Sequence, residues 1–183
     1  MTTTWTLDAS DGELLVHTGV AGRAARMGHR LTIAMTRWRA TVNWTSAEPT
    51  EPTAAELTVD TESLQVLRGE GGVKGLSGAE KALVRSNALR SLDASRFPEI
   101  RFAADSVEKT AQGYRLTGTL QIRGKSRDHV IDLRTEDLGG SWRMSAESPV
   151  RQSDYGVKPY SLLMGSLRVA DEVTVSFTAV GRR

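Results

Sequence analysis

Three histidines, His17, His29 and His129, are the first residues whose type could support chemistry. Imidazole is a common ligand of Zn²⁺, and three imidazoles can hold the metal with one position open to water or substrate. Their spacing follows no metal-site motif, and a histidine on a half-buried strand more often hydrogen-bonds a neighbouring group. We therefore expect neither a metal ion nor another cofactor.

Carboxylates and histidines could also supply a general acid and a general base. The aspartates fall in different expected elements, and none stands beside a recognisable partner. His29 and Asp154 are the pair with least against them, so an enzyme acting on an apolar substrate is kept as the alternative hypothesis. The leading expectation is a protein without catalytic residues.

Other chemistries are excluded by composition and spacing. The chain has no cysteine, which excludes thiolate nucleophiles, thiolate metal sites and disulfides. Residues 118–126 resemble a phosphate-binding loop, but five residues rather than four separate their glycines, so a hairpin turn is the better interpretation. Lys and Arg total 24 against 22 Asp and Glu, without a basic run, so nucleic acid is not an expected partner.

The elements that must position these residues are mainly strands. Apolar and polar residues alternate over most of the chain, and residues 96–133 form the longest such stretch, with three strands and two turns. Its central strand carries one apolar face, made of Tyr114, Leu116, Gly118, Leu120 and Ile122. A sheet with one apolar face must be covered by another layer or close on itself.

A change of parity favours closure into a barrel. The apolar residues Leu31, Ile33 and Met35 occupy odd-numbered positions. From Trp38 onward the apolar residues occupy even-numbered positions instead. Such a slip within one long segment is typical of a β-bulge or bend, which barrels use to curve.

One segment is expected to be helical. Ser77 and Glu80 fit a capping box, apolar residues then recur at helical spacing, and Phe97-Pro98 ends any helix. The predicted fold is an all-β, extended, eight-stranded antiparallel barrel, with one short α-helix as plug or lid. Residues 1–183 are expected to form one domain.

Several ordered motifs resemble the YceI-like lipid-binding family over essentially the whole chain. They are Trp5-Thr6-Leu7-Asp8, Leu57-Thr58-Val59-Asp60 with Ser63, Leu92 with Arg96-Phe97-Pro98-Glu99-Ile100-Arg101-Phe102, Gly118-Thr119-Leu120-Gln121-Ile122-Arg123-Gly124, Arg151-Gln152-Ser153-Asp154-Tyr155-Gly156-Val157 and Val169-Ala170-Asp171-Glu172-Val173. The resemblance implies a lipocalin-like barrel that holds a long apolar chain, such as a polyisoprenoid, an isoprenoid quinone or a fatty acyl derivative. It implies no catalytic residues.

The resemblance and the alternation together predict the ligand-binding residues. They are His29, Leu31, Ile33, Met35, Trp38, Phe97, Phe102, Tyr114, Leu116, Leu120, Met144, Asp154, Tyr160, Leu162 and Met164. A histidine that many family members carry before the aromatic-Pro signature is replaced within residues 85–91. His29, which lies between two arginines, and Tyr160 are therefore the expected headgroup contacts, with Leu162 and Met164 facing a tail.

The remaining expectations concern location and assembly. Neither a basic n-region with a following apolar stretch nor an apolar run of membrane-spanning length is found, which favours a cytoplasmic protein without an integral span. A third hypothesis is a structural homodimer, formed by two sheets that pair across a two-fold axis.

Overall fold

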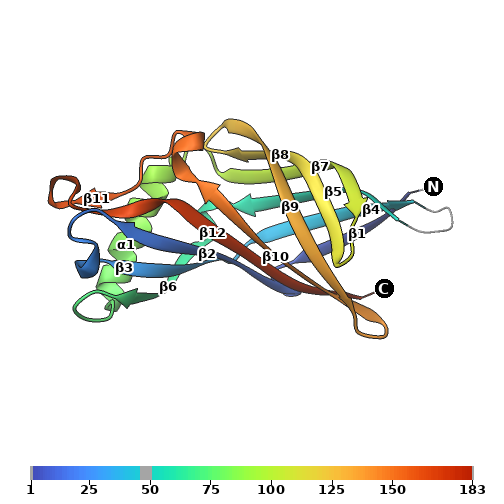
Figure 1. The fold of residues 1–183 in the computed structure, drawn as a ribbon, viewed down its shortest axis with the longest axis horizontal. Helices are drawn as coiled ribbons and strands as arrows, with labels where there is room; N and C mark the ends of the chain where they lie inside the picture. Colours follow the sequence, from blue (N-terminus) through green and yellow to red (C-terminus); the bar gives the residue numbers. More distant parts are fainter. Residues whose placement is uncertain (1, 46–50, 183) are drawn as a thin grey trace.

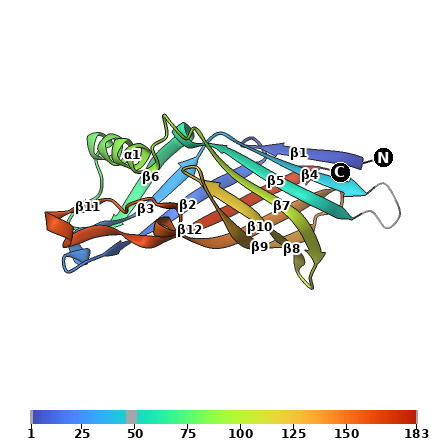
Figure 2. The ribbon, with the colours of Figure 1, turned by 90° about the horizontal axis from the view of Figure 1, so that it is seen from above.

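The alternating segments form one antiparallel sheet that curls into an elongated barrel (Figures 1 and 2). The structure is a computed structural model, and it describes residues 2–45 and 51–182. The strands in the described residues are β1 (Thr2–Asp8), β2 (Gly12–Ala21), β3 (His29–Met35), β4 (Trp38–Thr45), β5 (Pro52–Asp60), β6 (Leu64–Gly71), β7 (Glu99–Lys109), β8 (Gly113–Ile122), β9 (Lys125–Asp137), β10 (Ser141–Arg151), β11 (Ser161–Leu162) and β12 (Leu167–Arg182). Their order across the sheet is β1-β4-β5-β7-β8-β9-β10-β12-β2-β3-β6, and β11 pairs with β12.

The expected barrel is confirmed, but eight strands was too few. The described sheet has twelve strands. The parity slip divides one expected strand into β3 and β4, which have different neighbours: β3 pairs with β2 and β6, whereas β4 pairs with β1 and β5. The glycine-rich residues 69–75 were interpreted as a loop leading to the helix, but β6 continues through Gly71, because glycines conceal a strand pattern.

The meander is confirmed as β7, β8 and β9. β8 pairs with β7 on one side and with β9 on the other, both antiparallel. The register of β7 shifts between Ala104 and Ser106, so Val107 and Lys109, rather than the even-numbered residues, continue its inner face. A side chain at Gly118 would meet the backbone of Ala103, because the two strands lie unusually close there.

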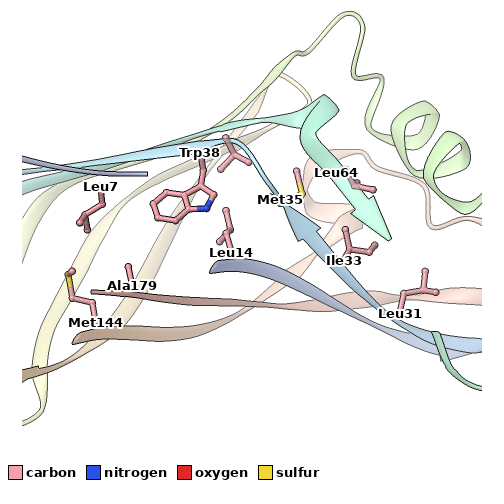
Figure 3. Close-up of a cluster of buried hydrophobic side chains, with 10 residues drawn as sticks. Leu7, Leu14, Leu31, Ile33, Met35, Trp38, Leu64, Met144 and Ala179 are labelled. Atoms are coloured by element: carbon pink, nitrogen blue, oxygen red, sulfur yellow. The ribbon is translucent and has the colours of Figure 1, made fainter. Parts of the chain in front are cut away.

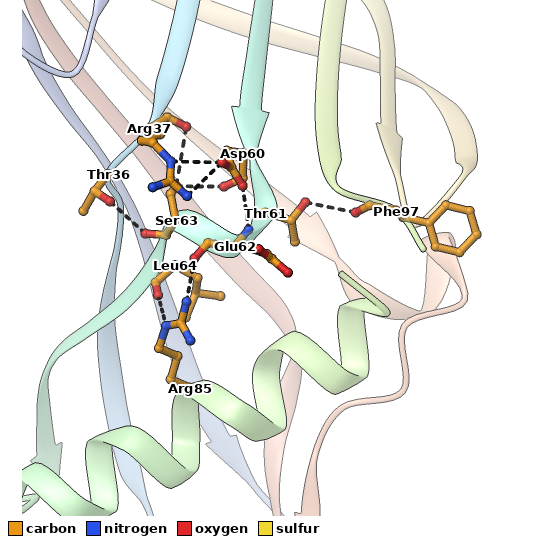
Figure 4. A network of polar contacts seen from close by, with 9 residues as sticks. All are labelled: Thr36, Arg37, Asp60, Thr61, Glu62, Ser63, Leu64, Arg85 and Phe97. Atoms are coloured by element: carbon orange, nitrogen blue, oxygen red, sulfur yellow. Dashed lines mark hydrogen bonds and ion pairs between the residues drawn. The ribbon is translucent and has the colours of Figure 1, made fainter. Parts of the chain in front are cut away.

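Polar contacts join the corner between β3 and β4 to the turn between β5 and β6 (Figure 4). Arg37 binds the carboxylate of Asp60 at 2.9 Å, and that carboxylate also accepts the backbone N–H of Glu62. Ser63 donates its hydroxyl to the carbonyl of Asp60 at 2.7 Å. Asp60 and Ser63 of the family motif thus stabilise the turn from β5 into β6.

The expected helix is α1 (Gly78–Leu92), and it lies against the β6 end of the barrel (Figure 2). The capping box is present: Glu80 accepts the Ser77 N–H at 2.6 Å, and Ser77 Oγ accepts the Glu80 N–H at 3.2 Å. The helix ends at Leu92, because Asp93 takes a left-handed conformation. Arg85 ties it to the sheet by donating to the carbonyls of Leu64 and Glu62.

The barrel interior contains two packed clusters. The first gathers residues from β1–β6, β10 and β12, among them Leu31, Ile33, Met35 and Leu64, and α1 packs against it through Val84, Ala88, Leu89 and Leu92 (Figure 3). The second gathers Phe102, Leu116, Leu120, Val150 and Tyr155. In the described part of the chain, no helix has the length and apolar character needed to cross a bilayer.

Candidate functional site

A cavity of about 750 Å³ occupies the part of the barrel away from α1. No residue of β3, β6 or α1 lines it. Its walls are mostly the inward apolar residues of the other strands, including Leu7, Leu14, Val42, Leu57, Val107, Leu116, Ile131, Leu133 and Val175. The barrel is therefore packed at one end and hollow at the other.

Tryptophans form much of the outer wall of this cavity. Trp5, Trp44 and Trp142 all line it, from β1, β4 and β10. The rings of Trp5 and Trp44 meet edge to face, with centroids 5.5 Å apart and planes at 72°. Such pairs are worth about 0.5–1.5 kcal/mol beyond the area they bury. The contact between Trp5 and Trp44 therefore stabilises the pairing of β1 with β4 beside the cavity.

The cavity reaches the strand ends of β1, β7 and β8, at the end of the barrel where both termini lie (Figure 1 shows the termini). Thr3 and Lys109 line it and are also exposed to solvent, so this end communicates with water. Tyr114 lies opposite Lys109 across the β7–β8 hairpin. Burial, with the negative charge of Glu51, raises the pKa of the Tyr114 phenol, which therefore stays neutral. The mouth thus has a polar rim above an apolar interior.

Aromatic rings form the floor of the cavity. Phe102 and Phe177 line it from β7 and β12. Trp38 lies beneath Phe177, with ring centroids 5.3 Å apart and planes at 73°, and belongs to the packed cluster that α1 covers. This contact marks the boundary between the hollow and the packed half of the interior.

A second, polar pocket of about 620 Å³ lies where β9 and β10 part. The two strands pair only from Trp142↔Asp137 to Ser145↔Arg134, and they then diverge (Figure 1). We call the opening between them the seam. Its lining includes Arg127, His129, Arg151, Asp154 and Glu172. Arg127 donates to the Asp154 carbonyl at 3.0 Å, and this hydrogen bond joins two residues of the seam lining.

Comparison with known proteins decides the family. The sequence model of the YceI-like domain matches residues 5–180. This protein belongs to the YceI-like family. No curated protein sequence matches the chain.

Solved structures of YceI-like proteins have the same fold. BcnA from Burkholderia cenocepacia is similar with a TM-score of 0.71 and 18% identity, over 96% of this chain and 99% of that one. The YceI protein of Campylobacter jejuni is similar with a TM-score of 0.61 and 16% identity, over 82% of this chain and 84% of that one. A mutant of the Campylobacter protein was crystallised with a monobromobimane guest. At these identities the likeness concerns the fold.

Four of the residues predicted from sequence line the cavity. They are Phe102, Tyr114, Leu116 and Met144. Leu31, Ile33, Met35 and Trp38 instead pack in the cluster beneath α1, and Leu120 packs with Val150 and Tyr155. Phe97 lies outside the cavity lining and packs against the turn at Gly124.

The remaining residues of the predicted set are not brought together at the cavity: they are His29, Asp154, Tyr160, Leu162 and Met164. His29 Nε2 bonds the carbonyl of Lys74 at 2.6 Å, whereas Asp154 lines the seam. Tyr160, Leu162 and Met164 are exposed at the α1 end of the barrel, and Met164 is 106% exposed. None of these five residues lines the cavity. In the described residues, no group of three or more His, Cys, Asp or Glu is arranged to hold a metal ion.

Sequence reasoning missed most of the cavity wall. The missed residues include Trp5, Leu7, Trp44, Val107, Trp142 and Phe177. Alternation marks most of these residues as inward-facing, but no local pattern separates an inward residue that packs from one that lines a void.

Proposed function

We propose that this YceI-like protein binds one long-chain apolar ligand in the cavity and carries or sequesters it. A polyisoprenoid, an isoprenoid quinone or a fatty acyl derivative has the required chemistry. The observation that carries the proposal is the hollow half of the barrel, about 750 Å³ in volume and walled by apolar side chains. Ligand pockets are commonly about 300–1,000 Å³, mostly apolar, with few polar groups.

The tryptophan wall supports the same proposal. Trp5, Trp44 and Trp142 present wide apolar surfaces to the cavity, and the polar rim with Lys109 leaves the mouth wetted. Displacing water from such surfaces contributes about 25 cal/mol per Å² of apolar area that is buried. An alkyl or prenyl chain would bury its apolar surface against these side chains.

Binding rather than turnover is proposed. The acid–base pair considered from sequence is separated, since His29 bonds Lys74 and Asp154 lies in the seam. An enzyme acting in the same pocket would need its acid and base to face the cavity together.

The direct test is native mass spectrometry of the protein purified from its own host, followed by organic extraction. We expect one apolar molecule per chain, released by solvent. A folded protein whose mass is that of the polypeptide alone, and which takes up no added long-chain lipid, would overturn the proposal.

A filled cavity provides the control. Ala146 lines the cavity, whereas Ala103 alternates with the inward Phe102 and Ala104 and therefore points outward. Ala146→Phe should stay folded and lose the ligand, and Ala103→Phe should retain it. Equal ligand content in the two variants would place the ligand elsewhere.

Location and assembly are also proposals. A cytoplasmic location is tested by fractionation of the host cell, where recovery with an extracytoplasmic marker would overturn it. Formation of a homodimer is tested by light scattering at several protein concentrations, where a monomer mass throughout would overturn it.

A further inference from the structure

The seam is an unusual opening in the wall of the barrel. From Lys125 to Leu133, β9 pairs only with β8, and from Ala146 to Arg151, β10 pairs only with β12. Two strand edges therefore face each other without a ladder, and such edges present unpaired N–H and C=O groups. Pro149, which has no N–H to donate, suits a strand with one unpaired edge.

One side-chain pair lies between the seam and the cavity. His129 lines the seam pocket, and the buried Ser148 lines the cavity. His129 Nε2 and Ser148 Oγ are 2.7 Å apart, and the imidazole meets Phe102 of the cavity floor edge to face at 6.1 Å. Ser148 is six residues along β10 from Trp142 at the mouth, or about 20 Å of strand. The pair therefore marks the deep end of the cavity.

The pair keeps hydrogen-bonding capacity in either tautomer of the histidine. If Nε2–H donates to Ser148, the Ser148 hydroxyl hydrogen and Nδ1 remain free as donor and acceptor. If Ser148 donates to Nε2, then Nδ1–H and the oxygen of Ser148 remain. Nδ1 has no protein partner within the described residues. Ser148 thus offers a free donor or acceptor at the deep end of the cavity, and His129, which lines the seam, offers the complementary group through Nδ1.

The surrounding charges do not favour an anion. Arg127 and Arg151 line the seam with Asp128, Asp154 and Glu172, so two cations face three carboxylates. Arg127 is also engaged with the Asp154 carbonyl. Burial lowers the pKa of His129, which keeps the imidazole neutral near neutral pH. A neutral donor–acceptor pair matches a hydroxyl, carbonyl or amide better than a phosphate or carboxylate.

We propose that His129 and Ser148 bind the uncharged polar head of the ligand at the deep end of the cavity, with its tail directed toward the mouth. This inference rests on the proposed lipid-binding function and adds the orientation of the ligand and the chemistry of its head. The seam gives that head access to water at the side of the barrel.

A histidine and a serine in contact also resemble half of a hydrolytic triad. In such triads a third group, usually a carboxylate, orients the histidine through its other nitrogen. His129 Nδ1 has no such partner in the described chain, so the pair is assigned to binding.

The test compares three probes of equal chain length, a primary alcohol, an alkane and a carboxylate, in titrations of the full-length protein. His129→Leu and Ser148→Ala remove the proposed contacts. His17→Leu is the matched control, because His17 Nε2 also bonds a serine hydroxyl across neighbouring strands, Ser176 Oγ at 3.0 Å, but lines neither pocket. Thermal unfolding checks each fold, and Ser148→Ala carries the test alone if His129→Leu does not fold.

The wild type should bind the alcohol about tenfold more tightly than the alkane, and at least as tightly as the carboxylate. His129→Leu and Ser148→Ala should lose that preference without weakening alkane binding, and His17→Leu should keep it. Equal binding of alcohol and alkane by the wild type would overturn the head site and leave lipid binding intact. Failure of all three probes to bind would instead count against the proposed function, and preference for the carboxylate or hydrolysis of an ester probe would overturn the assignment to neutral heads.

Discussion

The two halves of this barrel have the same strand pattern and opposite interiors. Near α1, Ile33, Met35 and Leu64 are each about 95% buried and pack against the helix. Toward the termini, Trp5, Trp44 and Trp142 surround a cavity of about 750 Å³. Alternation therefore builds the wall in both halves, and α1 packs against the half that is filled.

Truncation should distinguish the halves most strongly. Leu64→Ala removes a side chain packed in the cluster and should cost about 2–5 kcal/mol of unfolding free energy, because a new void is created. Leu116→Ala enlarges a void that already exists and should cost only about 1.5 kcal/mol. Chemical denaturation of the ligand-free protein measures both. Equal losses would mean that the two halves are packed alike.

The attachment of α1 should give the next largest effect. Arg85→Met removes charged hydrogen bonds to the carbonyls of Leu64 and Glu62 and should cost about 1.5–3 kcal/mol. Hydrogen exchange should then show earlier opening of the packed half than of β8 and β9. Arg90→Met, at an exposed position on the same helix, is the control and should change little. Uniform loss of protection across the barrel would contradict a separately anchored helix.

The helix start should contribute less. Ser77→Ala removes the N-terminal cap and should cost about 1 kcal/mol. The loss should appear as fraying of the first turn of α1 by hydrogen exchange, with ligand content unchanged. Reduced ligand content in this variant would show that α1 and the cavity are coupled.

The smallest effect concerns pH and the seam. Because burial lowers the pKa of His129, the unfolded chain binds a proton here at a higher pH than the folded protein does. Stability should therefore decrease as pH falls below about 6.5, until the folded pKa is reached. The charged residues that line the seam with His129 are Arg127, Asp128, Arg151, Asp154 and Glu172.

Unfolding free energies of wild type and His129→Leu, measured from about pH 7 to about pH 5, test this dependence. The variant should show the shallower decline. Parallel curves would contradict the burial of a neutral imidazole at the seam.

The fold was largely predictable because its signals are local. The capping box at Ser77, the parity slip after Met35 and the turns between β7, β8 and β9 each depend on a few adjacent residues. The strand count was less accurate, since pairing partners of β3 and β4 are set by contacts distant in sequence.

The site was less predictable, because whether side chains fill the barrel interior at a given level depends on the residues of all the strands around it. Ile33 and Leu116 are both inward residues on alternating strands, yet Ile33 packs in the cluster beside α1 whereas Leu116 also lines the cavity. His129 was recognised only as one of three histidines. Its relation to Ser148 depends on the separation of β9 from β10, which no local pattern reveals.

The most direct test of the central claim is to locate a bound ligand by NMR, from nuclear Overhauser effects between an unlabelled long-chain alcohol and ¹³C-labelled methyl groups of the protein. The account predicts contacts from the alkyl chain to Val107, Leu116 and Ile131, which line the cavity, and none to Ile33 or Leu64 beneath α1. Contacts to Ile33 and Leu64, with none to the cavity methyls, would contradict it.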